Sequence, residues 1–86
     1  MTKLINIGFG NVVNSSKIVA IISPDSAPSR RMIQNAKDTG TVIDATKGRK
    51  TKGVIVTDGG MLILSALMPE TISNRFYNKD SGEENE

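Results

Sequence analysis

The segment Asp44–Gly53 gathers side chains that bind anions. Its four cations follow one another with no carboxylate after Asp44; they are Lys47, Arg49, Lys50 and Lys52. Apolar runs precede and follow the segment, at residues 42–43 and 54–56, so we expect a loop held between two strands. Such a loop presents its charges in a fixed geometry and can bind phosphates. The segment alone is equally compatible with a solvated surface loop that adds solubility.

The amino-acid composition gives little support for an enzymatic function. The chain has no histidine and no cysteine, which excludes Ser-His-Asp triads, thiolate nucleophiles and the usual zinc sites. Asp44 and Asp58 stand at predicted turns, where aspartate commonly caps the backbone, so we expect no metal there. Gly8-Phe9-Gly10 lacks the third glycine of a dinucleotide fingerprint. The sequence therefore predicts a protein that is not an enzyme and has no cofactor.

Length and charge predict one small basic domain, residues 1–76, followed by an acidic tail, residues 77–86. The domain holds ten cations and five carboxylates, a formal charge of +5, whereas the tail carries -3. The tail is polar throughout its last nine residues, so we expect it to be disordered and to serve solubility or to compete with phosphates for the basic surface. Without disulfides, so small a domain gains stability from partner chains. No apolar run approaches the roughly 20 residues of a membrane span, so we expect a cytoplasmic protein without a membrane partner.

Two apolar strands are predicted in the first third of the chain. They cover Leu4–Phe9 and Lys17–Ser23, and the turn-forming residues Asn11–Ser16 lie between them. We expect these strands to form a β-hairpin, or a strand with a bulge at Gly8 and Gly10. The second strand is apolar on both faces, so it needs cover on both sides.

A helix is predicted over Ala27–Thr39, with Ser26 as its cap, Pro28 in its first turn and Gly40 as its stop. Its apolar stripe is narrow and consists of Met32, Ile33 and Ala36, while another face carries Arg30, Gln34 and Lys37.

The second half of the chain predicts a hairpin over Val54–Ala66, turning at Asp58–Gly60, and a short helix over Pro69–Phe76. The fold class expected from this order is α+β: a small, largely antiparallel sheet with one central helix and a short C-terminal helix.

The aromatic content favours duplex nucleic acid over single strands. Only Phe9, Phe76 and Tyr77 are aromatic, and we expect Phe9 in the core. Single-strand binders stack bases on several exposed rings, whereas duplex backbone recognition needs only cations on a rigid surface. The helix face with Arg30 and Lys37 would extend that surface, or is simply solvated.

Several motifs, in order, resemble the RemA family of extracellular-matrix regulatory proteins. They are Ile5–Asn11, Ser23–Pro28 followed by Arg31, Ile43–Thr46 with Gly48 and Arg49, and Leu64–Ala66 with Pro69–Thr71. The resemblance covers Lys3 to Phe76. It implies a bacterial, nucleoid-associated DNA-binding regulator that activates biofilm-matrix and osmoprotection genes, with no enzymatic activity. It also implies a ring-shaped homo-oligomer that presents repeated basic sites to double-stranded DNA and recruits or positions RNA polymerase.

The family pattern places DNA-contacting cations at the start of the second strand and in the loop after Asp-Ala-Thr. Those positions correspond here to Lys17, Arg49, Lys50 and Lys52. We add Lys47, Arg30 and Arg31 as candidate DNA contacts, the two arginines being equally compatible with contacts to a neighbouring subunit.

Two departures from the family pattern bear on recognition. Lys50 and Lys52 stand where the family commonly has arginine, which keeps the charge but loses two planar forks, so we expect phosphate contact rather than base readout from them. Gly53 replaces a larger residue, so we expect the following strand to begin later or to bend. The competing hypothesis is a structural or adaptor oligomer whose basic loop binds an acidic protein or a nucleotide ligand.

Overall fold

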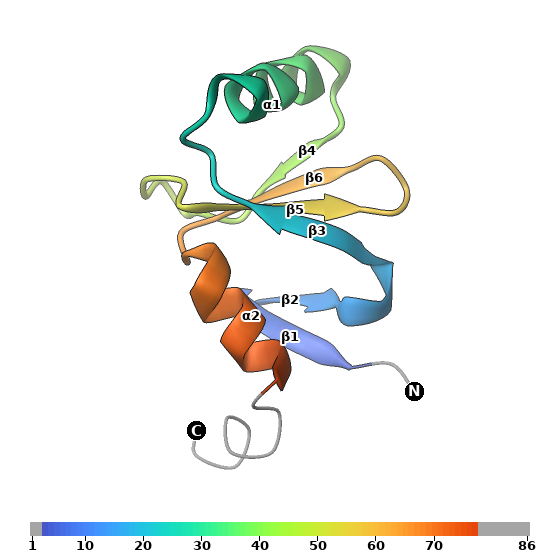
Figure 1. Cartoon of the computed structure of the whole chain (residues 1–86), viewed down its shortest axis with the longest axis vertical. Coiled ribbons are helices and arrows are strands. Elements are labelled where there is room, and N and C mark those ends of the chain that lie inside the picture. The colour runs from blue at the N-terminus through green and yellow to red at the C-terminus, as the bar shows by residue number, and fades with distance from the viewer. Residues whose placement is uncertain (1–2, 78–86) are drawn as a thin grey trace.

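The computed structural model describes residues 3–77, which stack in three layers (Figure 1). The middle layer is a four-stranded sheet in the order β3 (Ile18–Ile22), β5 (Gly53–Thr57), β6 (Leu62–Ser65) and β4 (Val42–Asp44). Helix α1 (Ala27–Thr39) lies on one side of this sheet. The hairpin of β1 (Leu4–Gly8) and β2 (Asn11–Asn14) lies on the other side together with helix α2 (Pro69–Tyr77). The α+β class with mostly antiparallel strands is thereby confirmed.

Helix α1 has the predicted bounds because its stop and start signals are local. The Ser26 hydroxyl accepts a hydrogen bond from the Ser29 amide at 3.1 Å, which satisfies a free donor of the first turn. Gly40 ends the helix at φ 74°, in the left-handed region that glycine enters without strain. Of the predicted apolar stripe, Ala36 is buried and Ile33 half-buried against the sheet, whereas Met32 is 40% exposed. The helix therefore packs on a stripe that is narrower than predicted.

The predicted pairing of Leu4–Phe9 with Lys17–Ser23 is wrong. Residues 11–14, expected to be a turn, form β2, which pairs antiparallel with β1 across a bulge between Asn6 and Gly8. The bulge predicted at Gly8 and Gly10 is thus present only beside Gly8, and Gly10 lies in the turn before β2. A short 3₁₀ helix, η1 (Ser15–Lys17), then carries the chain to β3, which pairs with β5. Burial of Val13 in the core stabilises β2 as a strand. The strand has only four residues, too few for an alternating pattern to be recognised in the sequence.

The predicted hairpin after the basic segment is confirmed, and the strand before that segment joins the same sheet. β5 and β6 pair antiparallel, whereas β4 pairs with β6 in parallel. Of the two alternatives predicted for Gly53, a later start of the strand is wrong, because β5 starts at that residue, and a bend there stays a prediction. A Cβ at Gly53 would lie 2.5 Å from the Leu67 carbonyl oxygen, so the chain approaches itself too closely there for any side chain.

The sheet separates two apolar cores. One lies toward α2 and the β1–β2 hairpin and is made of Ile5, Ile7, Val13, Ala45, Ile55 and Ile72. The other lies under α1 and is made of Ala36, Val54, Leu62 and Leu64. β3 contributes no fully buried residue to either core. The cover that its apolar sequence requires is thus incomplete within residues 3–77.

The chain ends of the described part bear on two predictions. Helix α2 reaches Tyr77, one residue beyond the predicted helix, and most of the predicted acidic tail, residues 78–86, lies outside the described residues. Neither helix within residues 3–77 is long and apolar enough to cross a membrane.

Candidate nucleic-acid interface

The basic segment is a surface loop between β4 and β5, seen in yellow-green beside the end of β4 in Figure 1. Its two ends are tied to β6: the Ala45 amide donates to the Leu64 carbonyl at 2.9 Å, and the Lys52 amide donates to the Ser65 carbonyl at 2.8 Å. Between these anchors, Ala45 and Thr46 are buried. The loop is therefore fixed at its base by the sheet, as expected from the apolar runs on either side.

Asp44 organises the turn into the loop through hydrogen bonds to Thr46. One carboxylate oxygen accepts hydrogen bonds from the Thr46 hydroxyl at 2.6 Å and from the Thr46 amide at 2.9 Å. These two bonds lower the pKa of Asp44, the hydroxyl bond most; burial opposes them in part, and the positive charge of Lys37 makes the smallest contribution, which also lowers the pKa. Asp44 is thus a charged capping residue, in keeping with the capping role expected from sequence.

The middle of the loop turns sharply and exposes the four cations. Lys47 and Gly48 both adopt left-handed backbone angles, φ 54° and 79°, and the Arg49 amide donates to the Thr46 carbonyl at 3.0 Å. The side chains of Lys47, Arg49, Lys50 and Lys52 are all exposed. Sequence reasoning placed these four residues on one pinned loop, and the fold does so.

Phe9 belongs to the surroundings of this loop, and its predicted place in the core is wrong. The residue is 45% exposed in the turn between β1 and β2. The Lys47 ammonium nitrogen lies 5.9 Å from the ring centroid and the Arg49 guanidinium carbon 5.5 Å from it, within cation–π range. The signal in the sequence is the pair of glycines around Phe9, which favours a tight turn over a strand interior.

Lys17 does not lie beside the loop. It ends η1, and its carbonyl accepts a hydrogen bond from the Asp58 amide at 2.8 Å, beside the β5–β6 turn. Lys52, by contrast, immediately precedes the opposite end of β5. At about 3.3 Å per residue, the six-residue separation of Asp58 from Lys52 corresponds to roughly 20 Å along the strand. Of the predicted cations, Lys17 therefore stands apart.

Arg30 and Arg31 lie in the first turns of α1, which the chain reaches directly from the end of β3. That end of β3 pairs with the start of β5, so the two arginines and the basic loop share one end of the sheet (Figure 1). Both side chains are exposed, and the Arg30 guanidinium donates to the Asp25 carbonyl at 3.0 Å. Arg31 is the freer of the two to extend a basic surface.

Two other cations of the domain, Lys3 and Arg75, donate hydrogen bonds to backbone carbonyls of the fold. The Lys3 ammonium donates to the Arg75 carbonyl at 3.0 Å and also to the Phe76 carbonyl, at the C-terminal end of α2. The Arg75 guanidinium donates to the Asn6 carbonyl at 3.0 Å. Residues 3–77 contain no group of three or more acidic, cysteine or histidine side chains arranged to hold a metal ion.

The fold and this loop define a small α+β domain with an exposed basic loop, and comparison with known proteins adds the family. The model of the RemA-like family, "Extracellular matrix regulatory protein A-like", matches residues 4–76. The chain therefore belongs to the RemA-like family, which confirms the resemblance carried by its motifs.

Several curated relatives match nearly the whole chain, and each bears the name "Putative regulatory protein". One from Lachnoclostridium phytofermentans is 59% identical over 100% of this chain and 94% of its own length. Another, from Alkaliphilus metalliredigens, is 58% identical over 95% of this chain and 88% of its own. A third, from Heliobacterium modesticaldum, is 60% identical over 92% of this chain and 87% of its own.

Proposed function

We propose that this protein is a regulatory protein that binds double-stranded DNA through the phosphates, using the β4–β5 loop as its main contact. The observation that carries the proposal is the loop itself: four exposed cations on a segment tied to β6 at both ends, with its only carboxylate bonded to Thr46. Lysine and arginine on a rigid surface neutralise phosphates and release counterions, which favours binding without any base contact. The regulatory names of the relatives agree with such a role.

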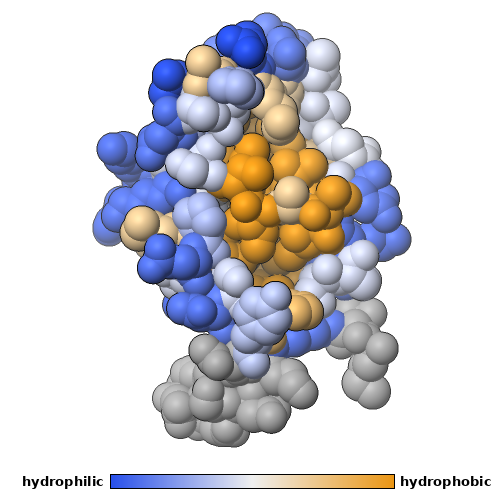
Figure 2. All heavy atoms as spheres, viewed as in Figure 1, coloured by the Kyte–Doolittle hydropathy of each residue, from blue (hydrophilic) through white to orange (hydrophobic). Residues whose placement is uncertain are grey.

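Self-assembly is the second part of the proposal, and it rests on β3. This strand is at the edge of the sheet, none of its residues is fully buried, and Val19 is 66% exposed where a bulge leaves it without a partner on β5. Figure 2 shows an apolar patch in the middle of the face that carries β3. Contiguous apolar patches on soluble proteins mark interaction sites.

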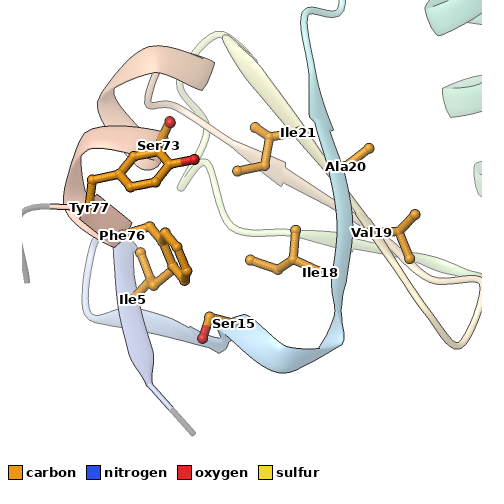
Figure 3. A pocket seen from close by; sticks show the side chains of 9 residues that line it. All are labelled: Ile5, Ser15, Ile18, Val19, Ala20, Ile21, Ser73, Phe76 and Tyr77. Atoms are coloured by element: carbon orange, nitrogen blue, oxygen red, sulfur yellow. The ribbon is translucent and has the colours of Figure 1, made fainter. Parts of the chain in front are cut away.

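A groove of about 280 Å³ lies beside this strand, between β3, β1 and α2. In Figure 3, Ile18 and Ile21 point into the groove toward Phe76 and Ile5, whereas Val19 points away from it. Both faces of β3 thus offer apolar side chains to a partner. The bulge disfavours simple strand addition at this edge, so the contact is one of packed side chains.

The occupant we propose is a second copy of the chain. Residues 78–86 contain no apolar side chain and cannot cover an apolar patch themselves. The same subunit exposes apolar side chains elsewhere, at Leu4, Val12 and Met68, which offer a complementary surface to the next subunit. A contact between two different patches is heterologous, and heterologous contacts that close generate rings.

A ring of subunits would let cations that are far apart in one subunit contact the same DNA duplex. Repetition of the loop around a ring makes each later phosphate contact intramolecular, which raises avidity by about 10² to 10⁴ without a new type of contact. Lys17, at the other end of the subunit, then supplies a second row of positive charge to the same duplex. Regulation of matrix and osmoprotection genes and positioning of RNA polymerase from the nucleoid are the cellular roles that this activity would serve.

The test is equilibrium binding of the full chain to a panel of promoter duplexes and a scrambled duplex at 50 and 200 mM salt, with sedimentation velocity of the same samples. We expect affinity to fall steeply with salt on every duplex and the protein to sediment as a closed oligomer. Weak, salt-independent duplex binding alongside tight binding of a nucleotide or an acidic peptide would favour the adaptor hypothesis. A monomer at binding concentrations would refute the ring.

A further inference from the structure

The turn between β1 and β2 holds a bulky residue in a backbone conformation that bulky residues avoid. Gly8, Phe9 and Gly10 have φ values of 106°, 56° and 80° in succession. Glycine adopts such angles freely, and asparagine tolerates them, but the Cβ of phenylalanine crowds the backbone there. Strain of this kind persists where the surrounding structure or the function requires it. The presence of phenylalanine at this position must therefore be explained by what its side chain contacts.

Packing in the core is not that reason. Phe9 is a member of neither apolar core, and the residue is 45% exposed. The contacts that distinguish the ring are those with Lys47 and Arg49, two cations of the β4–β5 loop. Lys47 itself adopts a left-handed backbone at φ 54°, so both sides of this contact depend on unusual local conformations. The β1–β2 turn and the β4–β5 loop, which are distant in sequence, thus place two cations beside one aromatic ring.

We infer that Phe9 is a positioning residue of the DNA-binding loop: its ring holds Lys47 and Arg49 in the orientation in which they meet phosphates. This inference rests on the proposed function. Long cationic side chains lose rotamer freedom when they bind, and a ring that limits this freedom beforehand lowers that cost. Because the pairing is exposed, it is weak enough to leave both charges available to a ligand.

Lys50 and Lys52 provide the internal comparison. Both are exposed on the same loop, yet neither is among the cation–π partners of Phe9 within the described residues. Loss of the ring should therefore weaken the contributions of Lys47 and Arg49 and leave those of Lys50 and Lys52 unchanged. An exposed cation–π pair corresponds to about twofold to fivefold in an equilibrium constant, so we expect a loss of that size for each of the two cations.

The first experiment compares three substitutions at Phe9 in the full chain, using a short duplex and thermal unfolding in parallel. Phe9→Tyr keeps the ring and should keep the affinity, whereas Phe9→Leu should lower it about fourfold to 25-fold for the two cations together. Phe9→Asn removes the ring and relieves the backbone, so affinity should fall while the melting temperature holds or rises. Parallel losses of stability and affinity in Phe9→Asn would overturn the inference, because a residue that merely shapes the turn would behave in that way.

The second experiment is a pair of double-mutant cycles on the same duplex. Phe9→Leu combined with Arg49→Ala should lose less than the product of the single losses, with a coupling of about twofold to fivefold. Phe9→Leu combined with Lys50→Ala should be multiplicative. Equal coupling in both cycles, or none in either, would overturn the inference. A greater effect of Phe9→Leu on single-stranded than on duplex DNA would do the same, because it would mean that the ring stacks on bases directly.

A third measurement separates this inference from the proposed function, since it needs no DNA. The side-chain protons of Lys47 and Arg49 should show ring-current shifts in the NMR spectrum of the free protein, and Phe9→Leu should abolish them. Met32→Ala, an exposed truncation on α1, should leave them in place. Absence of duplex binding by the wild-type protein would refute the proposed function, and absence of these shifts would refute the positioning role.

Discussion

Substitution of two loop cations, Arg49→Ala with Lys50→Ala, should change the salt dependence of duplex binding by a calculable amount. Each phosphate neutralised contributes about 0.9 to the slope of log affinity against log salt. If the four exposed cations of one loop each meet a phosphate, affinity should fall roughly 150-fold between 50 and 200 mM salt for one engaged subunit. With two cations left, the fall over the same range should be only about 12-fold.

The double substitution should leave the fold intact, because both side chains are exposed and neither truncation leaves a buried polar group unpaired. Fluorescence anisotropy with a short duplex, measured at several salt concentrations, gives the slope directly, and circular dichroism and thermal unfolding check the fold. An unchanged slope and affinity in the folded double mutant would refute the assignment of the loop as the DNA contact.

A charge-preserving swap, Arg49→Lys with Lys50→Arg, is the matched control. It keeps the number of cations in the loop, so the salt slope should stay at its wild-type value. If the contacts are to phosphates, the affinities for promoter and scrambled duplexes should also move together. A selective loss on the promoter duplex would instead mean that the planar guanidinium of Arg49 reads a base edge.

Four further experiments test other parts of the chain. Gly53→Ala should destabilise the domain by about 1–3 kcal/mol in urea unfolding, since its Cβ would meet a backbone oxygen, whereas Gly59→Ala, with open space around it, should stay within about 1 kcal/mol of wild type; equal effects would contradict the packing argument. Val19→Asp should give a protein that is folded by circular dichroism, sediments as a smaller species and binds duplex more weakly, and full affinity in such a variant would rule out the ring as the binding form. Deletion of residues 79–86 removes a net charge of -3 and should tighten duplex binding at low salt but not at high salt, and equal binding at low salt would limit the tail to solubility. The depressed pKa of Asp44 gives stability that is present above about pH 3.9 and lost as the pH falls through the folded value, so Asp44→Asn should flatten the acid limb of the stability profile, and an unchanged limb would show that its bonds to the turn add nothing.

Local signals in the sequence were enough for α1, for the β5–β6 hairpin and for the position of the basic loop. Ser26 and Gly40 fix the two ends of α1, each through a hydrogen bond to a residue three or four positions away and, at Gly40, through its own backbone angle. Gly60 takes φ 88° in the β5–β6 turn, which glycine allows without strain. The loop cations were identifiable because charge on a segment between two apolar runs must remain at the surface. All of these depend on neighbours along the chain.

Strand partners and the surroundings of the loop were decided only by tertiary structure. β2 is a strand because Val13 is buried against residues far away in the sequence, and β4 joins β6 in parallel, which no turn motif encodes. Phe9 was expected in the core on grounds of hydrophobicity, yet the left-handed turn directs its ring to Lys47 and Arg49. The family pattern grouped Lys17 with the loop, whereas their positions at opposite ends of β5 separate them within one chain. Capping, turn geometry and charge act over a few residues and can be inferred from sequence, but pairing and burial depend on which distant segments meet.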